Sequence, residues 1–194
     1  MNSFRSKCGT PYSLTIFYRL VNCILLLSAA AIFSGLAAAQ DEIPPDAAPP
    51  PAKFLSSEEV RLLETDNKDI KKRTKTLLQL MDNRLKAAES SAENQQFDTM
   101  FAELGGFHGL MDNAMDFLAA SGGKSKKVPK KVLENYKRFE IALRGFAPRL
   151  ELIRRNAPST HEFYVRTLLK QLRDARTKAT DPFYGDTVLS DGKP

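Results

Sequence analysis

His108 is the side chain around which this sequence could do chemistry. Asp112 follows it by four residues and would share its helix face, as ligands of a metal site in a helical bundle do. Met111 and Met115 belong to the same segment, and His and Met are axial ligands of haem. One His–Asp pair is far short of a full ligand set. We therefore expect a structural histidine, with no metal and no cofactor. The alternative is a small-ligand, metal or haem carrier centred on His108.

The sequence contains none of the compact motifs of common enzyme active sites. It has no Gly-x-Ser-x-Gly elbow, no phosphate loop, no dinucleotide fingerprint and no His-Glu-x-x-His. A catalytic triad would have to use His108 or His161, and both fall at apolar positions of helical spacing. We predict that the protein is not an enzyme, although a carboxylate pair assembled by the fold stays open.

Residues 1–39 have the order of a secretory signal peptide. Basic residues and no acid precede an apolar run over 20–36, which leads to three alanines ending at Ala39. We predict cleavage near Ala39 and export to the periplasm or the medium. An uncleaved membrane anchor is the alternative, because the run is only just shorter than the ~18–20 residues of a spanning helix. Both cysteines, Cys8 and Cys23, lie in this segment, so the mature chain forms no disulfide.

The rest of the chain predicts an all-α protein. Residues 40–55 are rich in Pro and Ala and are expected to form an extended spacer. Residues 56–180 contain four segments with apolar residues three and four apart, separated by short connections. This pattern favours an up-down-up-down four-helix bundle, followed by a tail over 181–194. A pair of tetratricopeptide-like hairpins is disfavoured, because no second copy stands at a 34-residue offset.

Several local signals refine the helices. Polar residues predict a break near Asp66–Asp69, and Gly145 with Pro148 predicts a kink or two shorter helices. Ser159 and Glu162 have capping-box spacing, and Asp181-Pro182 is expected to end the last helix. Glycines at 105, 106 and 109 indicate a bend or the close approach of a neighbouring helix.

Charge is unevenly distributed along the mature chain. Residues 40–122 hold nine Lys and Arg against fifteen Asp and Glu, whereas residues 123–194 hold seventeen against eight. If each of these two stretches forms a helical hairpin, the hairpins carry opposite net charge and attract each other. Many of the charged side chains would simply lie on solvent-exposed helix faces. Lys68, Lys71, Lys72 and Lys75 form one helical stripe. As the contact surface we favour the central basic loop and a stripe on the last helix: Lys124, Lys126, Lys127, Lys130, Lys131, Arg166, Lys170 and Arg173.

Three stretches resemble a group of secreted bacterial helical proteins that has no assigned activity. They cover residues 84–89, residues 103–111 and residues 173–185, and none contains a diagnostic catalytic motif. The resemblance implies a bacterial envelope setting and assigns no functional residue. We therefore expect a non-enzymatic binding or interaction module whose partner is an envelope protein or an anionic polymer or lipid surface. Nucleic acid is not expected as a partner, and a self-associating structural protein is a third reading.

The signal peptide makes the first testable prediction. Intact-mass measurement of the protein recovered outside the cytoplasm should give a chain that begins at or close to Gln40. A recovered chain that retains residues 20–36 would instead identify this segment as an uncleaved anchor.

Overall fold

The computed structural model describes residues 43–123 and 128–184, and this part of the chain contains five helices and no strand. The predicted all-α class is therefore confirmed. The predicted signal peptide lies outside the described residues. No helix among those described is both long and apolar enough to cross a membrane. The helices are α2 (Ser57–Thr65), α3 (Ile70–Glu93), α4 (Phe97–Gly122), α5 (Lys130–Asn156) and α6 (Ser159–Tyr184).

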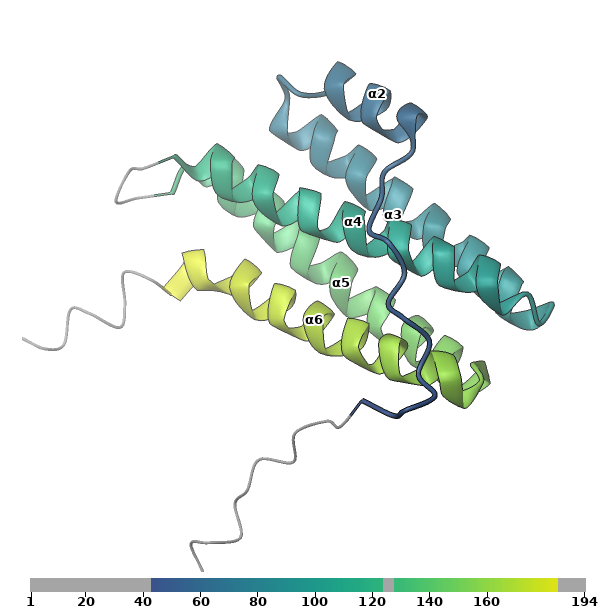
Figure 1. Cartoon of the computed structure of the whole chain (residues 1–194). Coiled ribbons are helices and arrows are strands. Elements are labelled where there is room, and N and C mark those ends of the chain that lie inside the picture. The colour runs from purple at the N-terminus through teal and green to yellow at the C-terminus, as the bar shows by residue number, and fades with distance from the viewer. Residues whose placement is uncertain (1–42, 124–127, 185–194) are drawn as a thin grey trace, which may run out of the picture. The chain divides into compact units, whose positions relative to one another are not determined.

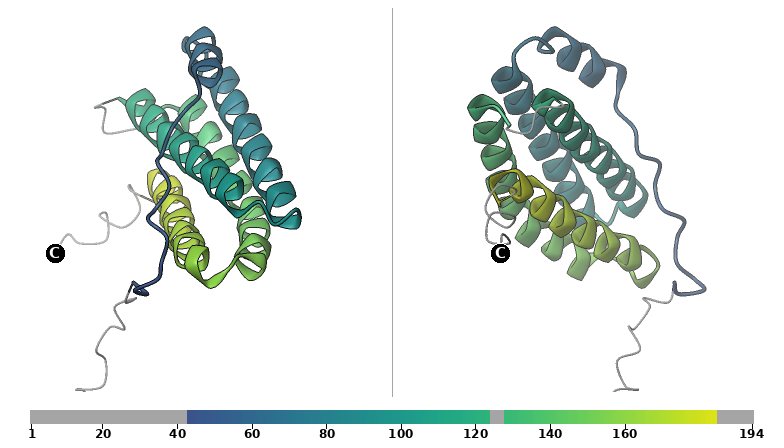
Figure 2. Two further views of the ribbon diagram at one scale, coloured as in Figure 1. Left: turned by 45° about the vertical axis from the view of Figure 1, so that its right-hand side comes forward. Right: turned by 90° about the vertical axis from the view of Figure 1, so that its left-hand side faces the viewer.

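The four long helices form two antiparallel hairpins, α3 with α4 and α5 with α6 (Figure 1). The hairpins pack together mainly through α3 and α5, whereas α4 touches α5 and α6 much less extensively. No Cα atom of α3 lies within 8 Å of a Cα atom of α6. In a closed up-down-up-down ring the first and last helices would be neighbours. Here α4 and α6 instead face each other along a more open side (Figure 2).

Apolar residues of helical spacing form the core of the described residues. Met81, Leu104, Phe139 and Leu168 come from the four long helices, and each is completely buried. The sequence placed all four on apolar seams, because residues three and four apart share one helix face.

The expected break between α2 and α3 is present and has a local cause. Ser56 and Glu59 form a reciprocal capping box that starts α2, and the carboxylate of Asp69 accepts from the backbone N–H of Lys71 to start α3. Asp66, at the end of α2, accepts a 2.6 Å hydrogen bond from the Thr76 hydroxyl. Because Asp69 caps the N-terminus of a new helix, α3 begins there and α2 does not continue through this segment.

Three other local predictions concerned the ends and interruptions of helices. Helix α5 is one continuous helix through Gly145 and Pro148, so the prediction of two shorter helices is wrong. Pro148 lies on an exposed turn of that helix, where its missing N–H removes one backbone hydrogen bond. Glu162 does not cap α6 and instead accepts a 2.6 Å bond from Arg154. Pro182 lies inside α6, which continues to Tyr184, so the predicted end of this helix at Asp181-Pro182 is wrong.

The Pro-rich segment over residues 43–55, which we call the strap, lies across α6 and α4 rather than standing away from the helices (Figures 1 and 2). The Ala48 N–H donates to the Thr160 carbonyl at 2.8 Å. A Cβ added at Gly105 would overlap the Ala52 carbonyl oxygen, and one added at Gly109 would lie 3.1 Å from the Phe54 carbonyl oxygen. Gly105 and Gly109 of α4 therefore admit the strap, whereas a Cβ added at Gly106 would lie 2.9 Å from Nε of Arg84 on the neighbouring helix α3.

Arg84 of α3 joins the segments at the upper end of the strap. Its guanidinium donates to Glu59 of α2 at 2.8 and 2.9 Å and to Glu103 of α4 at 2.8 Å. The same group lies 4.9 Å from the centre of the Phe54 ring. Burial acts to raise the pKa of Glu59, but the hydrogen bonds from Arg84 and Ser56 outweigh it and lower that pKa.

Two mid-helix glycines provide a matched test of the strap. Alanine is favoured over glycine in a helix by about 1 kcal/mol. A Cβ at Gly145 meets nothing within 4 Å, so Gly145→Ala should stabilise the protein by about this amount in urea unfolding. Gly105→Ala should show no such gain and should expose residues 43–55 to limited proteolysis. Equal stabilisation by both substitutions would contradict the seating of the strap on α4.

Candidate functional site

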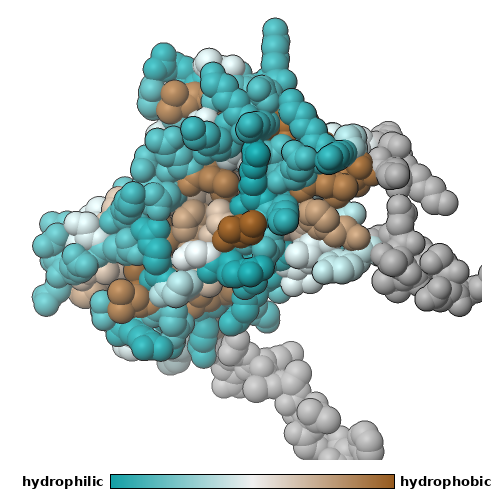
Figure 3. Space-filling model, turned by 180° about the vertical axis from the view of Figure 1, so that it is seen from behind, coloured by the Kyte–Doolittle hydropathy of each residue, from teal (hydrophilic) through white to brown (hydrophobic). Residues whose placement is uncertain are grey.

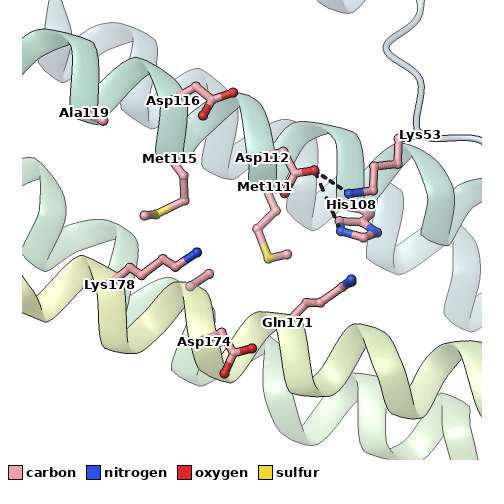
Figure 4. A pocket seen from close by; sticks show the side chains of 11 residues that line it. Lys53, His108, Met111, Asp112, Met115, Asp116, Ala119, Gln171, Asp174 and Lys178 are labelled. Atoms are coloured by element: carbon pink, nitrogen blue, oxygen red, sulfur yellow. Dashed lines mark hydrogen bonds and ion pairs between the residues drawn. The ribbon is translucent and has the colours of Figure 1, made fainter.

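A groove of about 460 Å³ separates α4 from α6 (Figure 4). Met111 and Met115 project into it from α4, and Gln171 and Lys178 approach from α6. Lys53 of the strap stands at one end. The groove exists because α3 and α5 carry the main contact between the hairpins, which leaves α4 and α6 apart.

His108 lies at the strap end of the groove and is only 3% exposed. Its Nδ1 lies 3.2 Å from the hydroxyl of Tyr164 on α6, and its Nε2 lies 3.8 Å from Oδ2 of Asp112. Lys53 Nζ donates to the same Asp112 oxygen at 2.7 Å. With Asp112 on the Nε2 side, the favoured tautomer carries its proton on Nε2 and accepts from Tyr164 at Nδ1.

The surroundings of His108 keep the imidazole neutral. Burial lowers its pKa below the ordinary value of 6.5, Asp112 acts in the opposite direction, and Lys53 lowers it further. Burial also raises the pKa of Tyr164, with a smaller contribution from Asp112. Both side chains therefore offer hydrogen bonds but no charge at neutral pH.

A second cavity, of about 360 Å³, lies beneath the strap and meets the groove at Lys53, His108 and Gln171. Prolines of the strap and Phe163 of α6 give it mainly apolar walls. The buried Gln171 Oε1 has no hydrogen-bond partner among the described residues. The polar side chains therefore gather where the groove meets the more apolar cavity, an arrangement suited to binding a ligand with both polar and apolar parts.

The predicted His108–Asp112 pair shares one helix face, as the spacing indicated. Among residues 43–123 and 128–184, no group of three or more His, Cys, Asp and Glu side chains is arranged to hold a metal ion. His161 lies away from the groove, with its ring 4.7 Å from that of Phe101. Its Nδ1 lies 2.9 Å from the Thr160 hydroxyl.

The described members of the predicted basic surface lie apart from one another. Lys124, Lys126 and Lys127 are outside the described residues. Lys130 and Lys131 begin α5, and Lys131 lies 3.4 Å from Asp69 of α3. Arg166 is near the start of α6, which is the opposite end of the hairpin because α5 and α6 are antiparallel; it lies 3.9 Å from Glu162. Lys170 and Arg173 are exposed farther along α6.

Sequence reasoning missed Lys53, Gln171 and Tyr164 as members of the site. Lys53 stands in a Pro-rich stretch that is typical of a spacer, and Gln171 has no motif around it. The only sequence signal near this site was the group of three glycines in α4, which indicated that another segment packs closely against this part of the helix.

No family model, curated protein or solved structure matches this chain.

The neutral state of His108 predicts an acid-sensitive fold. Below pH 6.5 the unfolded chain binds a proton that the folded chain resists, so stability falls as pH falls, by at most about 1.4 kcal/mol per pH unit for one group. His108→Gln should flatten this dependence in urea unfolding between pH 7.5 and 5. His161→Gln is the control and should retain the parental behaviour. An unchanged profile in His108→Gln would contradict the prediction.

Proposed function

We propose that the mature chain is an exported, non-enzymatic binding module of the bacterial envelope, built as a four-helix bundle that is open between α4 and α6. Its groove would receive a segment of a partner envelope protein. The single observation that supports this function is the groove itself, which combines a methionine floor with acidic side chains from both walls.

The floor of the groove suits a peptide. Met111 and Met115 are unbranched and polarizable, so they adapt to the shape of apolar side chains laid against them. Ala119 of α4 and Ala175 of α6 are small and leave room between the walls. An apolar groove between two helices is a common docking place for an amphipathic segment.

The charged side chains on the two sides of the groove indicate which charge the bound peptide segment carries. Asp116 of α4 and Asp174 of α6 line the groove, and neither has an ion-pair partner among the described residues. Among the described residues that line the groove, only Lys178 and Lys53 are positively charged, and Lys53 is already bonded to Asp112. A basic side chain flanked by apolar residues would therefore complement this part of the groove.

A small-ligand carrier centred on His108 is the second candidate. The cavity beneath the strap supports it, because this space adjoins the buried His108 and the unpaired Gln171 oxygen. Such a carrier would hold an apolar molecule with one hydrogen-bonding end, and native mass spectrometry of the purified protein would detect it.

Adjacent alanines allow the peptide-binding groove to be tested. A photo-crosslinking amino acid replaces Ala119, which lines the groove, or Ala120, which is exposed but does not line it. In cells that export the protein, we expect an adduct with an envelope protein from position 119 and not from position 120. Asp174→Lys should abolish that adduct through charge repulsion.

Adducts of equal yield from both positions, or an adduct unaffected by Asp174→Lys, would contradict peptide binding in the groove. Absence of any adduct at 119, together with a small molecule in native mass spectra, would assign the protein to the carrier class instead.

A further inference from the structure

The α3–α5 face, on the side of the domain away from the strap, has a second groove of about 500 Å³. Lys71, Thr74, Lys75 and Leu78 line it from α3, and Arg138, Ile141 and Ala142 line it from α5. The interface of the two helices has ion pairs near both ends. Lys131 pairs with Asp69 at one end, and Arg149 bonds Asp82 at 2.7 Å and Glu89 at 2.6 Å toward the other.

Between these paired ends, the three basic side chains that line the groove have no acidic partner among the described residues. Lys71, Lys75 and Arg138 are exposed, and none forms an ion pair with another described residue. Thr74 is 1% exposed, and its hydroxyl has no hydrogen-bond partner in the described part of the chain. The described residues that line this groove therefore include three positive charges and no carboxylate, so an anion would complement it.

Apolar side chains extend this face along α5. Ile141 and Leu152 are the most exposed aliphatic side chains of the described helices, at 53% and 56%. They are eleven residues apart, which is close to three helical turns, so they lie on the same stripe of α5. Seen from behind, hydrophobic side chains show at the surface among hydrophilic ones (Figure 3).

We propose that the α3–α5 face binds the surface of an anionic membrane, with Lys71, Lys75 and Arg138 contacting lipid phosphates and Ile141 entering the headgroup region. Basic side chains near a negatively charged bilayer and exposed aliphatic side chains at its interface act together in this way. A soluble polyanion would use the cations and leave Ile141 and Leu152 exposed. The face is separate from the α4–α6 groove and does not depend on it.

Vesicle cosedimentation tests the electrostatic contribution to membrane binding. Each variant is purified in the form that the exporting cells release, and vesicles contain either phosphatidylcholine alone or a mixture with phosphatidylglycerol. We expect binding to the mixed vesicles only, weakened by salt. Changing Lys71, Lys75 and Arg138 to Glu should weaken it on the order of 100-fold, since each basic residue near such a surface contributes about 1 kcal/mol.

A matched triple variant separates this face from the surface predicted by sequence alone. Lys130, Lys170 and Arg173 are exposed on α5 and α6, and changing them to Glu alters the net charge equally. Binding should change less than threefold in this variant, with helical circular dichroism unchanged in both. An equal loss in both triples, or a loss in the second alone, would overturn the proposal.

A second pair of variants tests the contribution of exposed apolar side chains to membrane binding. Ile141→Ser should weaken vesicle binding several-fold, whereas Ile43→Ser, on the strap at the opposite side, should not. Dextran sulfate serves as a soluble polyanion. If it binds as tightly as the vesicles and Ile141→Ser has no effect, the face recognises a polyanion and the membrane proposal is wrong.

Discussion

The close approach of the strap to the backbone of α4 is the constraint on which the candidate site depends. It requires a helix surface without side chains, which Gly105 and Gly109 provide at a cost in helix propensity. Because the strap lies directly on α4, Lys53 reaches Asp112 and stands beside His108. The same contact encloses the cavity against Phe163 and Tyr164. Alanine in place of these glycines would favour helix formation in α4, but its Cβ would block the close approach of the strap.

The two hairpins are joined asymmetrically, and charge contributes to that asymmetry. Arg149 of α5 holds two carboxylates of α3, while α4 and α6 have only limited contact with each other. The ion pairs between the acidic and basic hairpins are in line with the attraction expected from their net charges. They add to the apolar packing that joins α3 and α5, while the opposite side of the domain is more open and forms the groove.

Most of the helical framework was accessible from the sequence, but the site was not. The apolar seams predicted the buried residues, because side-chain periodicity within a helix is a local property. The His108–Asp112 face was predictable for the same reason. Tyr164 and Gln171 come from α6, some sixty residues later, and no local pattern indicates which helix faces His108. The prediction that Gly145 and Pro148 divide α5 into two helices was wrong because helix propensity is a weak local preference, which the packing of the rest of the helix overrides.

The sequence by itself determined the helical class, the position of the helices and which side of each is apolar, because these follow from residue types three and four apart. It also determined the uneven distribution of charge along the chain. Only the tertiary structure decided that the Pro-rich segment packs on α4, that Lys53 and Gln171 line the same groove as His108, and that Lys71, Lys75 and Arg138 share a second groove. Those juxtapositions depend on how the hairpins pack, which is a non-local property of the chain.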